Sequence, residues 1–378
     1  MSESLRTQAE TALDGVVDPW NGSSLKPALH ALSLDAGCLR VELQLGYPSA
    51  GLAGDIKPAV QAALCGLPGV SSVDVALRHT IVAHSVQQGA QAIAGVRNVI
   101  AVGSGKGGVG KSTTAVNLAL ALAREGARVG VLDADVYGPS LPTLLGVNDK
   151  PHLVEGDERR IAPLNGHGLQ CMSIGFLIEP DAPMVWRGPM ATQALEQLIR
   201  DTAWDDLDYL VVDLPPGTGD IQLTLAQRVP VSGAVIVSTP QDLALADAVK
   251  GLKMFEKVKV PILGIVENMS THICSQCGHE EHIFGAGGGA RMAERHGVPL
   301  LGSLPLDIRI REQADGGQPT VRRGGLLQWS DGVSPSAFRR VPECGRKKPG
   351  REPGLEKLGS ARTDPATAGY ESERCPCR

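Results

Sequence analysis

The sequence has few cysteines, no long apolar run and no excess of basic charge. Eight Cys in 378 residues are too few for a disulfide-stapled scaffold, so closely spaced Cys indicate metal binding or redox chemistry. No apolar run approaches the roughly 18 residues that a membrane-spanning helix needs. The formal net charge of −5 argues against a protein that binds nucleic acid through a basic surface. The first residues lack the apolar core of a signal peptide, so we expect a cytoplasmic protein with reduced thiols.

The length suits more than one domain, and the pattern changes along the chain. Residues 1–90 predict a small α+β domain, and residues 91–97 a linker. Residues 98–321 alternate short, continuously apolar strands with helices. This alternation predicts an α/β domain whose mostly parallel sheet is covered by helices on both faces. Residues 322–378 hold twelve Lys and Arg against seven Asp and Glu, without apolar periodicity, which indicates a disordered basic tail.

A glycine-rich motif follows the apolar run at residues 99–102 and precedes a predicted helix. Gly105-Lys-Gly-Gly-Val-Gly-Lys-Ser fits G-x-x-x-x-G-K-[ST] in the strand–turn–helix context that a phosphate-binding loop requires. Its glycines let backbone N–H groups turn toward phosphates, Lys111 is expected to neutralise them, and Ser112 is expected to hold Mg²⁺. The predicted nucleotide-binding residues of this loop are Gly105, Lys106, Gly107, Gly108, Val109, Gly110, Lys111, Ser112 and Thr113.

A carboxylate follows a second apolar run, at residues 209–212. Asp213 stands where that strand should end, which suits a side chain that holds the water shell of Mg²⁺. Gly217, four residues later, is expected to donate its backbone N–H to the γ-phosphate of a nucleotide. The sequence therefore predicts that the protein binds ATP with Mg²⁺.

The extra lysine of the loop, Lys106, resembles that of the deviant Walker A motif in the MinD/ParA/nitrogenase-reductase class of ATPases. The resemblance implies that Lys106 reaches the partner subunit's nucleotide across an ATP-sandwich homodimer. It also implies that Asp135 orients the attacking water, that Asp133 supports Mg²⁺ and that Asn268 contacts adenine. Helix N-caps for the aspartates and a simple turn for the asparagine are the alternatives. Lys106, Lys111 and Asp135 are thus the expected catalytic residues.

A C-x-x-C pair, Cys274 and Cys277, lies in a polar segment of the α/β domain. A two-fold dimer would supply four thiolates to a [4Fe–4S] cluster. A zinc site with His279 and His282 is a second possibility, and a thiol redox pair is a third. The residues alone leave these three open. Other cysteines are expected to be packing residues: Cys38, Cys65 and Cys171.

Seven motifs follow one another in residues 96–320: GSGKGGVGKST, DADVYGPS, VWRGPM, VVDLPPGTGD, ENMS, CSQCG and FGAGGG. This ordered set resembles the Mrp/ApbC family of iron–sulfur cluster carriers, which favours the cluster over zinc. The resemblance implies a homodimer that bridges a labile [4Fe–4S] cluster through Cys274 and Cys277, hydrolyses ATP slowly and hands the cluster to apoproteins. The N-terminal section resembles the small accessory domain of that family, with Trp20 replacing the acid of an Asp-Pro-Glu loop. No role follows for Arg187 of the VWRGPM motif.

Two rival functions are a ParA- or MinD-like positioning ATPase and a zinc-stabilised nucleotide-binding scaffold. The first would act on DNA or a membrane, but residues 1–321 carry a net charge of −10, so we expect neither nucleic acid nor membrane as a partner. The second would bind zinc, whereas a cluster carrier binds iron and sulfide, so metal analysis would separate them.

After Val321 the sequence departs from the family, and we interpret residues 322–378 as the product of a reading-frame change. A genuine appended arm, in which Cys375 and Cys377 could bind metal, is the alternative.

Overall fold

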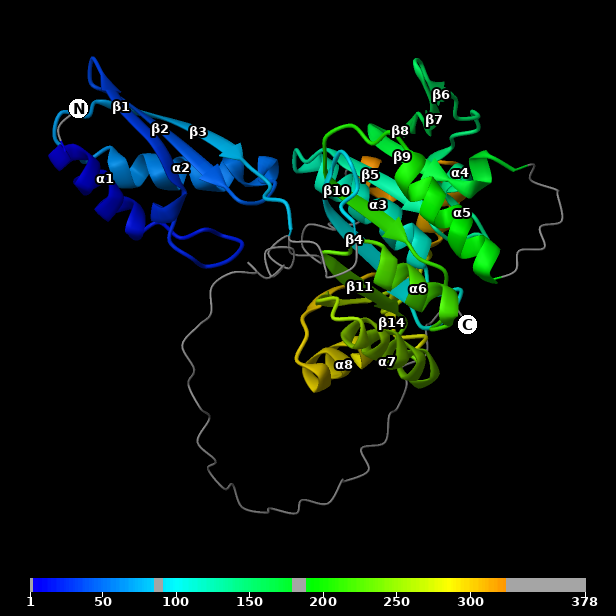
Figure 1. Cartoon of the computed structure of the whole chain (residues 1–378). Coiled ribbons are helices and arrows are strands. Elements are labelled where there is room, and N and C mark those ends of the chain that lie inside the picture. Colours follow the sequence, from blue (N-terminus) through cyan, green and yellow to red (C-terminus); the bar gives the residue numbers. More distant parts are fainter. Residues whose placement is uncertain (1–2, 85–90, 179–187, 324–378) are drawn as a thin grey trace, which may run out of the picture.

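The computed structural model describes residues 3–84, 91–178 and 188–323, which form two units (Figure 1). Each unit has its own hydrophobic core. The first core belongs to a small N-terminal unit and the second to a larger α/β unit. Within the described residues, no helix is long and apolar enough to cross a membrane. Arg187 and the predicted tail beyond residue 323 lie outside these ranges.

The N-terminal unit packs two helices against one face of a three-stranded sheet (Figure 1). The sheet has the order β1-β2-β3, with β1–β2 antiparallel and β2–β3 parallel. Alternate residues of β2, such as Leu39, Val41 and Leu43, are buried, because successive side chains of a strand point to opposite faces. The elements are α1 (Glu3–Asp14), η1 (Lys26–Ala28), β1 (Leu29–Asp35), β2 (Cys38–Leu45), η2 (Ala50–Leu52), α2 (Ala53–Leu64) and β3 (Ser72–His79).

The larger unit is built on an eight-stranded sheet with the order β15-β12-β11-β4-β10-β5-β9-β8. Neighbouring strands run parallel except for the edge pair β8–β9, which is antiparallel. The fold class predicted from the sequence is confirmed. The strands are β4 (Val96–Ser104), β5 (Val129–Asp133), β8 (Leu164–Gly166), β9 (Leu169–Ser173), β10 (Leu207–Asp213), β11 (Gly233–Ser238), β12 (Ile262–Glu267) and β15 (Leu300–Ser303).

Helices pack along this sheet, with α3 against β4, β5 and β10, α7 against β11, and α8 against β12. Two short hairpins, β6–β7 and β13–β14, stand outside it. The remaining elements are α3 (Lys111–Arg124), α4 (Leu141–Leu145), β6 (Leu153–Val154), β7 (Asp157–Ile161), η3 (Ile174–Phe176), α5 (Gly188–Asp201), α6 (Asp220–Arg228), α7 (Asp242–Lys257), β13 (His272–Ile273), β14 (Glu280–Glu281), α8 (Gly288–His296), α9 (Ile308–Asp315) and η4 (Thr320–Arg323).

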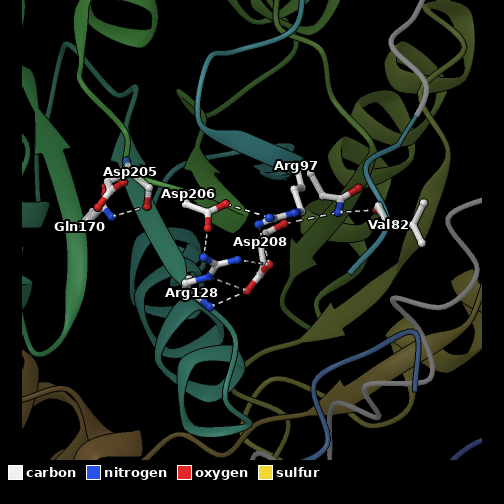
Figure 2. A network of polar contacts seen from close by, with 8 residues as sticks. Val82, Arg97, Arg128, Gln170, Asp205, Asp206 and Asp208 are labelled. Carbon is white, nitrogen blue, oxygen red and sulfur yellow. Dashed lines mark hydrogen bonds and ion pairs between the residues drawn. The ribbon is translucent and has the colours of Figure 1, made fainter. Parts of the chain in front are cut away.

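A polar network ties together the amino ends of β4, β5 and β10 (Figure 2). Asp208 is 4% exposed and accepts hydrogen bonds from Arg97 Nη1 at 3.0 Å and from the backbone N–H of Arg128 at 2.9 Å. The exposed carboxylate of Asp206 pairs with both arginines. Because a buried carboxylate needs partners, this network fixes three strands at the edge opposite their carboxyl ends.

The two units touch where α3 ends. The backbone N–H of Ala50 donates to the carbonyl of Glu125 at 3.1 Å, and that of Gly51 donates to Glu125 Oε2 at 2.7 Å. These N–H groups belong to η2, directly before α2, so Glu125 supplies acceptors to a helix start in the other unit. Ile81 and Ile93, on either side of the connection, pack into the larger core.

Candidate nucleotide site and cysteine hairpin

The predicted phosphate loop and carboxylates lie at the carboxyl edge of the large sheet. β4 leads into the loop at Gly105, and Asp133 and Asp213 are the last residues of β5 and β10. These strands are neighbours, and Asp213 stands in register with Asp133. The parallel register therefore brings together side chains that are far apart in the sequence.

Glycine is required at two positions of the loop. A Cβ on Gly105 would lie 2.2 Å from the backbone of Asp247 in α7, so only glycine fits there. Gly110 has φ +83°, and a Cβ on it would lie 2.1 Å from Nδ2 of Asn268. The loop thus passes close to two other segments before α3 begins at Lys111.

The loop lysine points into the carboxylates. Lys111 is 6% exposed, and its Nζ lies 2.5 Å from Oδ1 of Asp213 and 3.9 Å from Oδ2 of Asp135. Ser112 Oγ lies 3.4 Å from the same nitrogen. The sequence-predicted lysine, serine and two carboxylates therefore lie close together at this edge of the sheet.

Asp213 suits the predicted Mg²⁺ role. It is fully buried, and its Oδ2 has no hydrogen-bond partner among the described residues. Burial raises the pKa of this carboxyl above its ordinary value, although the Lys111 cation opposes that rise. A hard oxygen ligand that is buried and unpaired fits a divalent cation beside the phosphates.

The carboxylate of Asp133 accepts hydrogen bonds from the backbone of the segment that follows it. Its Oδ1 accepts the N–H of Asp135, and its Oδ2 accepts from the N–H groups of Ser140 and Leu141 and from Ser173 Oγ. Burial and the neighbouring charge of Asp213 raise the pKa of Asp133 to about 6. The contacts at Ser140 and Leu141 resemble the N-cap alternative, since α4 begins there, and the support of Mg²⁺ stays a prediction.

Other predicted site residues lie around this centre. Asp135 is 9% exposed and faces Lys111, as a residue that orients water would. Gly217 donates its N–H to the Ser104 carbonyl at 3.0 Å, so donation to a γ-phosphate would need that bond to break. Lys106 is half-buried, and no ion pair of its ammonium occurs within the described ranges.

Asn268, directly after β12, contacts the phosphate loop. Its Nδ2 donates to the Val109 carbonyl at 2.9 Å, and its backbone N–H donates to Ser238 at 2.7 Å. The following residue, Met269, has φ +57°, a left-handed conformation that side chains other than glycine rarely adopt. Asn268 therefore contacts the phosphate loop, and its contact with adenine stays a prediction.

The cysteine pair occupies the tip of the β13–β14 hairpin, which follows β12 at the same edge of the sheet. Cys274 donates its N–H to His279 O at 2.9 Å, and Gly278 donates to Cys274 O at 2.9 Å, which closes the turn. Cys277 is exposed and Cys274 is half-buried. Both sulfurs are therefore on a short turn at the surface.

The other cysteines differ from one another. Cys171 is buried, and burial raises the pKa of its thiol to about 12, as suits a packing residue. Cys38 is half-buried, whereas Cys65 is exposed, so the packing role predicted for Cys65 is wrong. It lies just past the end of α2, where the apolar face of the helix has ended.

Glu267 has a structural role that was not predicted from the sequence. This glutamate ends β12, is 3% exposed, and accepts the N–H of Gly289 in the first turn of α8. A Cβ on Gly289 would lie 2.9 Å from Glu267 Cβ. The ENMS and FGAGGG motifs therefore meet in space, and an acid directly after an apolar strand was the available signal.

In the Asp-Pro-Trp loop of the N-terminal unit, the Asp18 carboxylate finds its hydrogen-bond partners within the unit. Asp18 is 2% exposed, and its carboxylate accepts from the Trp20 N–H at 2.9 Å and from the Tyr47 hydroxyl. The rings of Trp20 and Tyr47 stand 5.4 Å apart. Asp18 thus holds a turn together.

The glycine loop between β4 and α3, its buried lysine and the carboxylates at the ends of β5 and β10 define a P-loop NTPase. Comparison with known families assigns the chain more narrowly. Residues 95–330 match the ParA family, described as NUBPL iron-transfer P-loop NTPases, and the chain belongs to this family. Residues 6–75 match a second family, the iron–sulfur cluster assembly proteins.

Several relatives bear names of the same kind. The iron–sulfur cluster carrier protein of Pseudomonas fragi is 59% identical over 69% of this chain and 91% of its own length. The protein of that name from Escherichia coli K12 is 55% identical over 80% of this chain and 81% of its own. The mouse iron–sulfur cluster transfer protein NUBPL is 57% identical over 61% of this chain and 72% of its own.

One solved structure supports the fold of the larger unit. The nucleotide-binding protein of Archaeoglobus fulgidus, determined in complex with ADP, is 36% identical to this chain. The match covers 66% of this chain and 93% of that one, with a TM-score of 0.54.

Proposed function

We propose that this protein is an ATP-dependent carrier that holds an iron–sulfur cluster on Cys274 and Cys277 and transfers it to apoproteins. The observation that carries the proposal is the position of this pair, on a surface turn at the same sheet edge as the phosphate loop. The names of the relatives support it, because three of them describe iron–sulfur cluster carriage or transfer.

The nucleotide part of the proposal follows from the buried ion pair. Binding of ATP draws Lys111 from Asp213 toward the phosphates, because a phosphate carries more negative charge than one carboxylate. Asp213 and Ser112 are then free to hold Mg²⁺, which neutralises charge on the phosphates. Asp135, beside the lysine, orients the attacking water, and hydrolysis is slow.

The cluster part requires two copies of the chain. A [4Fe–4S] cluster takes four thiolates, and each subunit offers two on the hairpin, so a two-fold homodimer completes the set. Exposed apolar side chains at the carboxyl ends of the strands support such an interface. They are Tyr137, Leu177, Leu243, Ile273 and Ile283. Nucleotide state alters the subunit geometry and with it the retention of the cluster.

The proposed function also implies which partners the protein has. The clients are apoproteins that need iron–sulfur clusters, and neither nucleic acid nor membrane is a partner. A cytoplasmic location stays a prediction from the sequence.

The test is anaerobic reconstitution of the full chain with iron and sulfide. We expect about four irons per dimer and a visible chromophore in the wild type. Cys277→Ala should lose both yet still bind ATP, because the phosphate ligands come from other loops. Cys65→Ala, which removes an exposed thiol outside the hairpin, is the matched control and should load normally. One zinc per chain without iron uptake, or full iron in Cys277→Ala, would contradict the proposal.

A further inference from the structure

The cysteine hairpin is too short to hold its own shape. β13 and β14 have two residues each, and only two residue pairs, His272–Glu281 and Ile273–Glu280, form the ladder. Isolated two-stranded hairpins are marginal in water even when longer. The spacing of the two sulfurs therefore depends on how the ends of the hairpin are anchored.

The entry side is anchored by the chain before α9. Ser270 donates its N–H to Leu304 O at 2.9 Å and its hydroxyl to the same carbonyl at 3.0 Å. Leu306 donates its N–H to Thr271 O at 2.7 Å, and His272 Nδ1 lies 3.2 Å from Leu306 O. Two backbone bonds therefore fix this side independently of any one side chain.

The exit side is anchored by an imidazole. His282 directly follows β14, and its Nδ1 lies 2.8 Å from the carbonyl oxygen of Ser270. A carbonyl only accepts, so Nδ1 is the donor of this bond. This bond closes residues 270–282 into a loop that contains both cysteines.

The acceptor of that bond is itself firmly placed. Ser270 is held by Leu304, and Asn268, two residues earlier, is bonded to Ser238 and to the phosphate loop at Val109. Because the Ser270 carbonyl is held in place, a single hydrogen bond to it can fix the position of His282. His282 thus ties the cysteine hairpin to the segment that touches the nucleotide loop.

We propose that His282 is a positioning residue of the cluster site, which fixes the spacing of Cys274 and Cys277 by donating from Nδ1 to Ser270. The proposal rests on the proposed carrier function. It assigns His282 a role distinct from metal ligation, in which Nε2 would bind the metal.

The test compares three substitutions in the full chain. His282→Asn keeps an N–H donor close to the position of Nδ1, His282→Gln places its amide near that of Nε2, and His282→Ala has neither. In the protein without cluster, amide hydrogen exchange at Cys274 and Gly278 should speed up about threefold to tenfold in the Ala and Gln variants. The Asn variant should stay close to the wild type, as should His279→Ala, whose ring makes no hydrogen bond within the described ranges.

The same variants are then loaded and challenged with an iron chelator. The chromophore should decay about threefold to tenfold faster in the Ala and Gln variants, with the wild-type lifetime restored in Asn. Rescue by Gln and not by Asn would identify Nε2 as a metal ligand and overturn the proposal, as would wild-type behaviour of all three. Failure of the wild type to take up iron would instead refute the carrier function. The amide exchange rates would still show whether the hydrogen bond between His282 and Ser270 holds the hairpin.

Discussion

The Nζ atom of Lys111 lies 2.5 Å from Oδ1 of Asp213, and both side chains are buried. A nucleotide would need Lys111 to turn toward its phosphates, and that movement would free the Asp213 carboxylate for a cation. Pairing satisfies two charges that would be costly to bury alone. On the proposed function, entry of a triphosphate with its cation would replace this pair by two others, Lys111 with a phosphate and Asp213 with the cation.

Replacement of Lys111 by Ala should weaken ATP binding by about tenfold to a hundredfold, since charged hydrogen bonds contribute about 1.5–3 kcal/mol each. Isothermal titration calorimetry measures this. Lys106→Ala is the comparison variant: the side chain is half-buried and makes no ion pair within the described ranges, so its loss should weaken ATP binding less than the loss of Lys111. If Lys106 acts across a dimer, that variant should lose hydrolysis. Unchanged affinity in Lys111→Ala would exclude the assignment of the phosphate loop.

The stability of the larger unit should depend on pH through Asp133. Burial and Asp213 raise the pKa of Asp133 from 3.8 to about 6, so the folded chain holds this proton more tightly than the unfolded chain does. The contribution of Asp133 to stability is fully present below pH 3.8 and is lost as pH rises through about 6. Carboxyl NMR should report the titration directly. In Asp213→Asn the pKa of Asp133 should fall, and a titration unchanged by that substitution would contradict the coupling.

In the polar network of Figure 2, the buried Asp208 should contribute more to the unfolding free energy than the exposed Asp206. Asp208→Asn replaces an acceptor of two arginine contacts by a group that also donates, and should cost about 1.5–3 kcal/mol of unfolding free energy. Asp206→Asn, at a side chain 54% exposed, should cost less than about 1 kcal/mol. Urea denaturation of both variants provides the comparison. Equal losses would mean that burial does not set the strength of these contacts.

Glu125→Ala should loosen the contact between the two units. The substitution removes the carboxylate that accepts from Gly51, so amide exchange at Gly51 should accelerate by up to about tenfold. Small-angle X-ray scattering should show a larger radius of gyration if the N-terminal unit separates. Arg124→Ala, at the exposed neighbouring position, should change neither quantity. Identical scattering and exchange in Glu125→Ala would show that other contacts hold the units.

The sequence predicted the elements whose signal is strong. The apolar runs that became β4, β5, β10, β11 and β12 are buried on both faces and therefore lack alternation, which is itself a recognisable pattern. The start of α3 at Lys111 coincides with the motif, because the loop glycines and the helix serve the same site.

Other elements gave weaker signals. β1 is an edge strand with a mostly exposed pattern, and the β13–β14 hairpin has two residues on each side, so neither produces a periodic apolar run. Contacts such as His282 with Ser270, or Glu125 with Gly51, depend on tertiary placement and have no local signature. Single-sequence reasoning therefore identifies the chemistry of a motif more readily than the contacts that hold it.

The helix α3 begins at Lys111 of the phosphate loop and ends beside Glu125, fourteen residues after that lysine. A helix of that length extends about 21 Å, and each residue turns it by about 100°. The number of residues between Lys111 and Glu125 therefore sets an angular phase as well as a distance. Insertion of one alanine into α3 would rotate Glu125, which contacts the N-terminal unit, by about 100° around the helix axis relative to Lys111. Helix length is thus a constraint on how this chain can vary, separate from any requirement on the identity of its side chains.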